Sequence, residues 1–201
     1  ELYISNSTNL INWSTPLAIT NNSISDFDTD ILIFNDVIYL TWASFVTSDN
    51  QEVFYSLTTD PFNFTDWTAN TIRLTNNSGL HDFEPSLFID QNNQIFITYC
   101  GHLNYTDEPN RTTEEILLLN TSIGNDNVWT TTRLTNNSVR DTYPGMIQSS
   151  SGIYHILYAS FNGQNLEIVI LSRNMTAKDA RDVTIWDTIP PNTTLVPGSI
   201  T

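Results

Sequence analysis

The chain has 201 residues and a mass of 22.8 kDa, enough for one ordinary domain with a real hydrophobic core. Asp and Glu number 22 against 7 Lys and Arg, and the resulting net charge of −15 repels phosphate backbones and anionic lipid headgroups, which excludes nucleic acid as a partner. One cysteine, Cys100, rules out an intrachain disulfide, and no apolar run reaches the roughly 18 residues of a membrane span.

An internal repeat organises most of the chain. The pattern Arg-Leu-Thr-Asn-Asn-Ser occurs within residues 72–78 and again at 133–138, and residues 17–23 are a looser copy. A tryptophan precedes each copy, and an acidic segment, an aromatic run and a strand led by glutamate follow it. These glutamates are Glu1, Glu52, Glu115 and Glu167, so one unit is about fifty residues long.

In chain order, the predicted strands are rich in β-branched and aromatic residues and are separated by Asn, Asp, Gly and Ser clusters. Strands led by glutamate begin at residues 1, 52, 115 and 167; acidic turns that open a strand span 26–31, 82–87 and 141–146; aromatic runs span 37–42, 95–99 and 153–158. Residues 35–36 and 90–93 suit tight hairpins between the first two strands of their units. Nothing shows sustained helical periodicity.

Four short strands in a unit of this length are typical of a β-propeller blade. We predict an all-β fold, a β-propeller of four-stranded blades, with about three and a half blades present. The predicted units are residues 1–51, 52–114, 115–166 and a partial 167–172, followed by a divergent last strand and a Pro-rich linker at 173–201. Because a propeller needs more blades to close, we expect the chain to be a piece of a longer protein; self-assembly of several copies is the alternative.

The repeat resembles a known family. The order Trp, Arg-Leu-Thr-Asn-Asn-Ser, Asp-x-x-Pro, aromatic strand and Glu-Ile is similar to the sialidase-like propeller repeats of archaeal and bacterial cell-surface proteins, relatives of the Asp-box or BNR repeat. The Asp-box pattern Ser-x-Asp-x-Gly-x-Thr-Trp is degenerate here, because the segments before Trp13, Trp67 and Trp129 all lack its glycine. The resemblance covers roughly residues 1–172.

Asn-x-Ser/Thr sequons are frequent. This composition would produce about five by chance, whereas eleven occur, which indicates an exported glycoprotein with glycans on exposed loops. The predicted glycosylation sites are Asn6, Asn12, Asn21, Asn63, Asn76, Asn104, Asn110, Asn120, Asn136, Asn174 and Asn192.

The resemblance to sialidases implies a substrate carboxylate held by three arginines, together with a tyrosine–glutamate nucleophile pair. Arg73 and Arg133 occupy equivalent repeat positions, but Ala18 stands at the third. Residues repeated in every unit are typical of structural roles, and we find no break in the repeat that would mark a catalytic site. The sequence therefore predicts no catalytic residues, although Arg140 and Tyr143 lie close together in the chain.

One metal site is a candidate. Asp26, Asp28 and Asp30 alternate at a strand start, where they either converge on a calcium ion or line a solvated face. No other cofactor is predicted. The three histidines show no ligand spacing and are predicted to be ordinary residues. Cys100 aligns with Ala43 and Ala159 and is expected to be a small buried residue.

Trp42, Tyr99 and Tyr158 share one repeat position, which favours core packing between blades. The longest insertion relative to the other units spans residues 103–114, and we expect it to contact a partner.

Two functions remain open from the residues and the resemblance. The favoured one is a non-catalytic, extracellular, glycosylated propeller of a cell-surface or S-layer-type protein, which serves adhesion, binding or assembly with other surface proteins or glycans. An archaeal source would suit the composition. The alternative is an exo-sialidase-like glycoside hydrolase, whose arginines and acids would converge at the mouth of the propeller channel.

Overall fold

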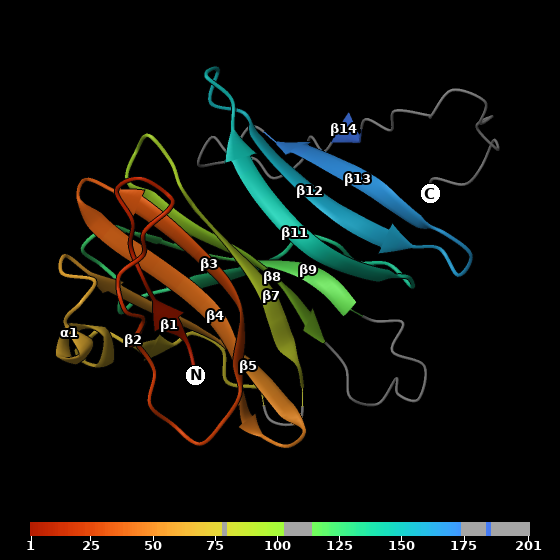
Figure 1. Cartoon of the computed structure of the whole chain (residues 1–201). Helices are drawn as coiled ribbons and strands as arrows, with labels where there is room; N and C mark the ends of the chain where they lie inside the picture. The colour runs from red at the N-terminus through yellow and green to blue at the C-terminus, as the bar shows by residue number, and fades with distance from the viewer. Residues whose placement is uncertain (78–79, 103–113, 174–183, 186–201) are drawn as a thin grey trace.

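The computed structural model describes residues 1–77, 80–102, 114–173 and 184–185. Within these residues the chain forms three four-stranded antiparallel sheets and one two-stranded sheet (Figure 1). The two-stranded sheet pairs β1 (Tyr3–Ile4) with β2 (Leu17–Ala18). The four-stranded sheets are β3 (Asp26–Phe34), β4 (Val37–Thr47), β5 (Asn50–Thr58) and β6 (Ile72–Arg73); β7 (Asp82–Ile89), β8 (Gln94–His102), β9 (Glu114–Ser122) and β10 (Thr130–Arg133); and β11 (Arg140–Gln148), β12 (Tyr154–Phe161), β13 (Leu166–Arg173) and β14 (Thr184–Ile185).

In each four-stranded sheet, strands that are consecutive in the chain lie next to each other, which confirms the predicted all-β fold and its order of strands. The first two strands are joined by tight hairpins at the predicted places. Asn35 and Asp36 both have positive φ angles, 51° and 60°, as a two-residue hairpin requires, and Asn93 has a φ of 60°. The linker predicted after residue 173 lies outside the described residues, apart from β14.

The acidic segments are not turns, which corrects the sequence prediction. They form the first strand of each sheet, and each strand contains a β-bulge in which its register against the second strand slips. The bulges pass over residues 28–29, 84–85 and 143–144. Two of them contain a proline, Pro85 and Pro144, and a proline is tolerated there because a bulge removes the need for a ladder N–H.

A short helix, α1 (Phe64–Ala69), lies between β5 and β6, where helical periodicity was not seen in the sequence. The side chain of Asn63 caps it by accepting from the Thr65 N–H at 3.1 Å. The helix buries Trp67, whose indole N–H donates to the Pro61 carbonyl at 3.0 Å. No helix in the described ranges is long and apolar enough to cross a membrane.

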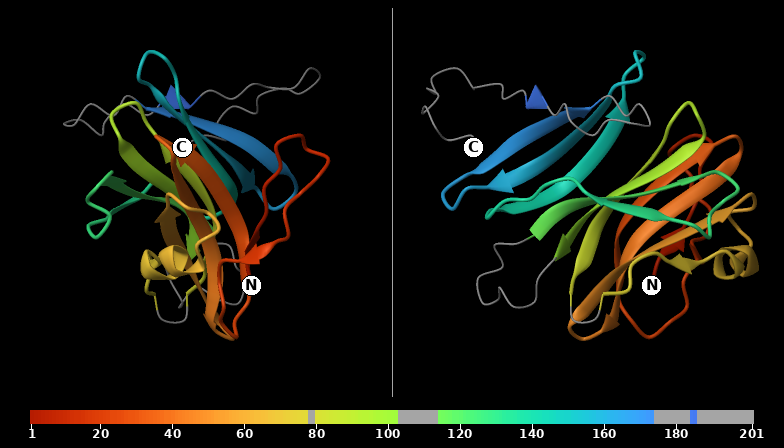
Figure 2. Two further views of the ribbon diagram at one scale, coloured as in Figure 1. Left: turned by 60° about the vertical axis from the view of Figure 1, so that its left-hand side comes forward. Right: turned by 180° about the vertical axis from the view of Figure 1, so that it is seen from behind.

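The sheets pack face to face, with the second between the first and the third (Figure 2). Tyr39, Val53 and Tyr55 of the first sheet share a core with residues of β7, β8 and β9, and Cys100 and Ile116 of the second sheet pack with Tyr158 of the third. Trp42, Tyr99, Tyr158 and Cys100 are all buried, which confirms their predicted core roles. First strands of neighbouring sheets lie side by side.

In the first two four-stranded sheets, a buried glutamate connects the sheet by hydrogen bonds to the start of the next one. Glu52 at the start of β5 is fully buried and accepts hydrogen bonds from Arg73 Nη2 at 2.7 Å, the Thr75 hydroxyl and the Asn77 main-chain N–H at 2.9 Å. The Asn77 side chain then donates to the carboxylate of Asp82, the first residue of β7, at 2.8 Å. The carboxylate therefore connects the start of β5 with residues 73–77, and Asn77 continues the connection to the first residue of β7.

The same contacts recur one unit later. Glu115 accepts from Arg133 at 2.8 Å, from the Thr135 hydroxyl and from the Asn137 N–H at 2.9 Å, and Asn137 donates to Asp141 at 2.8 Å. In the first unit, Glu1 accepts from the Asn22 N–H and Asn22 donates to Asp26, without an arginine. The repeated Arg-Leu-Thr-Asn-Asn-Ser pattern is thus the donor set of a repeated buried carboxylate.

We expect Arg133→Ala to lower the free energy of unfolding by about 2 kcal/mol, because it leaves the buried Glu115 carboxylate without its counter-charge. The measurement is urea-induced unfolding. Combining it with Glu115→Gln removes the unpaired charge, so the double variant should be less destabilised than the sum of the single variants. Simple additivity would contradict the coupling.

Stability should also depend on pH through Asp82. Burial, and secondarily the nearby Glu52 charge, raises the pKa of Asp82 to about 7. The folded state then holds a proton that the unfolded chain has released above about pH 4, so the free energy of unfolding falls as the pH rises from about 4 to 7. Asp82→Asn should remove this component. The measurement is urea-induced unfolding at a series of pH values. If the free energy of unfolding changed with pH equally in both proteins, the assignment of this pH dependence to Asp82 would be refuted.

Candidate active site

A chain of hydrogen bonds connects the bulges of the three first strands. The Asp28 carboxylate accepts from the Glu84 main-chain N–H, and Glu84 Oε2 accepts from the Tyr143 N–H at 2.9 Å. Asp28, Glu84 and Tyr143 occupy the same bulge position in successive sheets, and all three have positive φ angles, 49°, 53° and 54°. Non-glycine residues with positive φ are uncommon and cluster at functional sites.

The carboxyl groups of Asp28 and Glu84, the two acids in this line of hydrogen bonds, are harder to ionise than ordinary carboxyl groups. Partial desolvation raises the pKa of Asp28, opposed by the hydrogen bond from the Glu84 N–H. Desolvation also raises the pKa of Glu84, and the negative charge of Asp28 adds to the effect. Acids that keep their protons to a higher pH are suited to general acid catalysis near neutrality.

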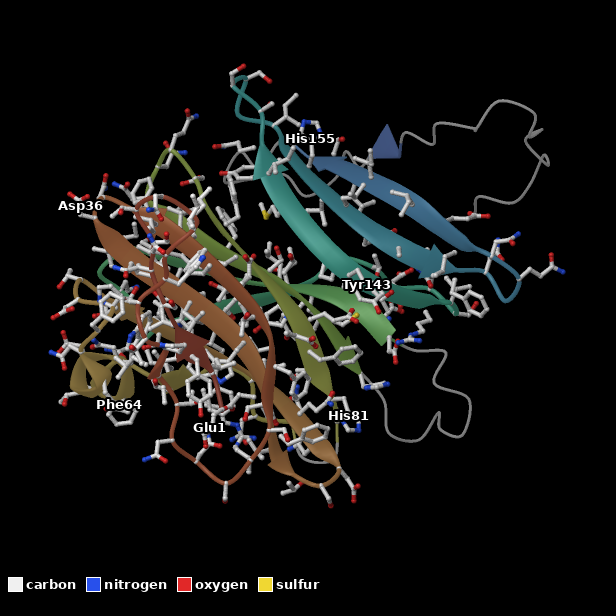
Figure 3. All side chains as sticks on the ribbon, viewed as in Figure 1. Glu1, Asp36, Phe64, His81, Tyr143 and His155 are labelled. Atoms are coloured by element: carbon white, nitrogen blue, oxygen red, sulfur yellow. The ribbon has the colours of Figure 1, made fainter. Side chains whose placement is uncertain are left out.

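Asp28 lines a pocket of about 480 Å³ at the end of the sheets where the first strands begin. The labelled His81 marks this end in Figure 3, opposite the hairpin that carries Asp36. Three aromatic side chains offer apolar surface in the lining, whose residues are Phe27, Asp28, Phe45, Ser48, Asp49, Gln51, His81, Phe83, His102, Glu114 and Arg140.

An ion pair between the buried Glu114 and the exposed Arg140 forms another part of the pocket wall. Glu114, which is 2% exposed, is paired with Arg140 Nε, and His102 Nε2 lies 3.6 Å from the other carboxylate oxygen. The ring of His81 stands edge-on to His102, with ring centroids 5.6 Å apart. Glu114 is paired with an arginine, whereas Asp28 is partly desolvated, so the pocket contains two acidic groups in different electrostatic surroundings.

The repeated arginines lie away from this pocket. Arg73 and Arg133 form ion pairs with Glu52 and Glu115 in the network between sheets, as expected for repeated residues. Arg140 is the arginine of the described lining, and it is already paired with Glu114. The pocket therefore does not present the three arginines that the resemblance to sialidases implies.

The candidate calcium ligands point to different partners. Asp26 accepts from the Ser44 hydroxyl at 2.6 Å, whereas Asp30 accepts from the Leu87 N–H at 2.8 Å and the Ser86 hydroxyl at 3.1 Å. Asp28 faces the pocket. Among the described residues, no group of three or more His, Cys, Asp or Glu side chains is arranged to hold a metal. The structure therefore does not bring the three together, and calcium binding stays a prediction.

The predicted glycosylation sites are mostly on the surface where the structure describes them. Asn6, Asn12, Asn21, Asn76 and Asn136 are exposed. Asn63 caps α1 and Asn120 lies in β9, and both are half-buried. Asn104, Asn110, Asn174 and Asn192 lie outside the described residues, as does most of the predicted partner-contacting insertion. Glycosylation and an extracellular location stay predictions.

Sequence reasoning missed two features of the pocket. His81 and His102 are far apart in the chain, so no spacing rule could show that their rings meet. That the histidines are not metal ligands stays a prediction. The second feature, a difference between the units at the bulge position, was present in the sequence but was not used in the prediction. Aligned units have Asp28, Glu84 and Tyr143 at one position, and such a departure from the repeat is what a functional site produces.

The fold is similar to that of solved glycoside hydrolases. A thermostable family-43 glycoside hydrolase matches 94% of this chain with a TM-score of 0.62 and 14% identity. An α-L-arabinanase of Penicillium chrysogenum in complex with arabinobiose matches 92% (TM-score 0.65, 11% identity), and an endo-arabinase of Bacteroides thetaiotaomicron matches 85% (TM-score 0.54, 14% identity). The chain covers 65%, 54% and 65% of these three structures, less than two thirds of each. No protein-family model and no curated protein sequence matches the chain.

These similarities define the class of fold: a propeller-like all-β protein, similar to five-bladed propeller enzymes. They do not support the sialidase-type or BNR repeat family. They also contradict the favoured functional prediction of a non-catalytic adhesion module, because the similar structures are glycoside hydrolases. That prediction rested on treating the whole repeat as structural, and it did not consider the position at which the bulges differ.

Glu84→Ala should loosen the contact between the second and third sheets, because it removes the acceptor of the Tyr143 N–H. We expect the Tyr143 amide proton to exchange with deuterium about fivefold faster, as measured by NMR. Glu84→Gln keeps an acceptor oxygen and should leave the rate nearly unchanged. Equal acceleration in both variants would show that the hydrogen bond does not protect this amide.

Proposed function

We propose that this chain carries the active site of a glycoside hydrolase, located in the pocket lined by Asp28 and Glu114. One observation carries the proposal: two carboxyl groups share one pocket in contrasting surroundings. Desolvation raises the pKa of Asp28, whereas Glu114 is paired with Arg140. Glycosidic bonds are usually cleaved by such a pair, one acid and one carboxylate.

The roles follow from these surroundings. Asp28 donates its proton to the leaving oxygen as the glycosidic bond breaks. The Glu114 anion either stabilises the positive charge that develops on the sugar or takes a proton from the attacking water. Water supplies the hydroxyl group for the freed sugar carbon, so the reaction is a hydrolysis. Arg140 and His102 contact Glu114 and position it.

The pocket favours neutral sugars. With Asp28 protonated, the charged lining among the described residues is Asp49, Glu114 and Arg140, and Arg140 is already paired with Glu114, which leaves a net negative field that repels carboxylated sugars. The aromatic rings of Phe27, Phe45 and Phe83 provide apolar surface on which sugar rings pack. Because solved structures with this fold include arabinanases, arabinan and arabinose oligosaccharides are the first substrates to test.

The test is hydrolysis by the natural protein at its full length, with arabinan, arabinobiose and a panel of neutral aryl glycosides. Asp28→Asn should lower kcat about a hundredfold or more, since it removes the proton donor. Asp36→Asn makes the same chemical change in the hairpin at the opposite end of the sheets and should stay within about twofold of the unchanged enzyme. No hydrolysis of any neutral glycoside, or equal rates for both variants, would contradict the proposal.

The pH–rate profile gives an independent readout. An acid catalyst must be protonated, so kcat should fall as the pH rises through the pKa of Asp28, which lies above that of an ordinary aspartate. Glu114→Gln should lower kcat about tenfold or more without moving this basic limb to a higher pH. A rate that rises with pH over this range would assign Asp28 as a base and refute its role as acid.

A further inference from the structure

The two-stranded sheet at the start of the chain is the outer half of a repeat unit. Tyr3 pairs with Ala18 and Ile4 with Leu17. Counted from the leading glutamates Glu1 and Glu52, Tyr3 and Ile4 stand at the positions of Phe54 and Tyr55. Phe54 pairs with Arg73 and Tyr55 with Ile72 where β5 joins β6, so the two pairings have the same register. β1 and β2 therefore correspond to the third and fourth strands of a complete sheet.

The inner half of this unit is missing from the described part of the chain. In the complete first sheet, the other edge of β5 pairs with β4 over its whole length. β1 has no second strand partner among the described residues, since its sheet contains β1 and β2 alone. An open strand edge presents unpaired backbone N–H and C=O groups, which are satisfied when another strand adds to it.

An apolar surface is uncovered beside this edge. Ile31 and Ile33 of β3 are 53% and 66% exposed. Their equivalents in β7, Leu87 and Ile89, are 8% and 7% exposed because the first sheet packs on them. The positions are matched by register, since Ile31 pairs with Leu40 as Leu87 pairs with Ile97. The second four-stranded sheet thus shows how deeply these side chains are buried when a neighbouring sheet covers them.

The outer part of the same face is already covered. Leu2 and Ile19, which flank β1 and β2, pack with Leu40 and Trp42 of β4 and with Trp67 of α1, and all are buried. The uncovered part is the strip along β3, where the first two strands of a preceding unit would lie. A complete four-stranded sheet cannot dock there, because β1 and β2 occupy half of its place. This argument disfavours a second copy of the chain, because its three larger sheets have four strands each and its two-stranded sheet repeats the outer half of a unit, not the inner half.

We propose that the open edge of β1 and the Ile31–Ile33 strip of β3 are a docking site for one antiparallel β-hairpin. This hairpin has the pattern of the first two strands of the repeat. Its second strand hydrogen-bonds to β1, and its apolar face covers Ile31 and Ile33. The hairpin completes a four-stranded sheet whose outer half is β1 and β2.

The opposite end of the array shows the matching deficiency. Ile168 of β13 is 64% exposed, although its equivalents Val53 and Ile116 are 0% exposed. Leu157 of β12 is 46% exposed, and its equivalent Thr98 is 0% exposed. Among the described residues, the third sheet therefore also has no neighbour at the place that its repeat position implies, as expected of an array that is completed by added strands.

The test compares two isoleucine-to-aspartate changes in the natural protein at its full length. Ile33→Asp places a charge under the proposed hairpin and should lower the folded-to-unfolded ratio about tenfold or more in urea. Ile11→Asp is the matched control, because Ile11 is 80% exposed in the β1–β2 connection and its change should stay within about twofold. Equal effects of the two changes would show that Ile33 is open to solvent and overturn the proposal.

Two further readouts identify the occupant. Hydrogen exchange of the β1 amides, followed by mass spectrometry, should be slow in the natural protein and faster in Ile33→Asp. Rapid exchange in the natural protein would overturn the strand addition. Light scattering should give the same oligomeric state for both proteins. An oligomer that dissociates in Ile33→Asp would assign the face to a second copy and equally overturn the hairpin. None of these outcomes depends on glycoside hydrolysis.

Discussion

Burial of one carboxylate in each of the first two four-stranded sheets is the constraint on which this structure depends. Glu52 and Glu115 are 0% and 1% exposed, and an ionised carboxylate in such a place is tolerated only when charged and polar donors surround it. Those donors lie in and directly after the last strand of the same sheet. The asparagine among them also donates a hydrogen bond to the first aspartate of the next sheet. Satisfying the glutamate therefore determines where the next sheet begins.

This arrangement places the bulges of the first strands next to one another. Asp28 accepts from the backbone of Glu84, and Glu84 accepts from the backbone of Tyr143, so the bulges form a continuous line across three sheets. The backbone conformation is the same at each bulge, but the side chain differs. A repeated scaffold with a varied side chain at one position is a way to build an asymmetric site from symmetric parts.

The repeat could be predicted from sequence because each of its parts obeys a local rule. The hairpin at Asn35 and Asp36 needs residues that tolerate positive φ, the glutamate recurs with its donor set, and Trp42, Tyr99 and Tyr158 recur at one core position. The bulges were not predicted, since an acidic segment before a strand has the composition of a turn. The helix α1 was missed because six residues are too few to show a helical period.

By itself, the sequence determined the all-β class, the repeat, the order of its strands and the core position of its repeated aromatic residues, because period and composition are properties of neighbouring residues in the chain. Tertiary structure decided that Asp28, Glu114 and Arg140 line one pocket, that His81 meets His102, and that Ile33 is exposed where Ile89 is buried. These are contacts between residues distant in the chain, and only the packing of one sheet on the next brings them together or leaves them uncovered.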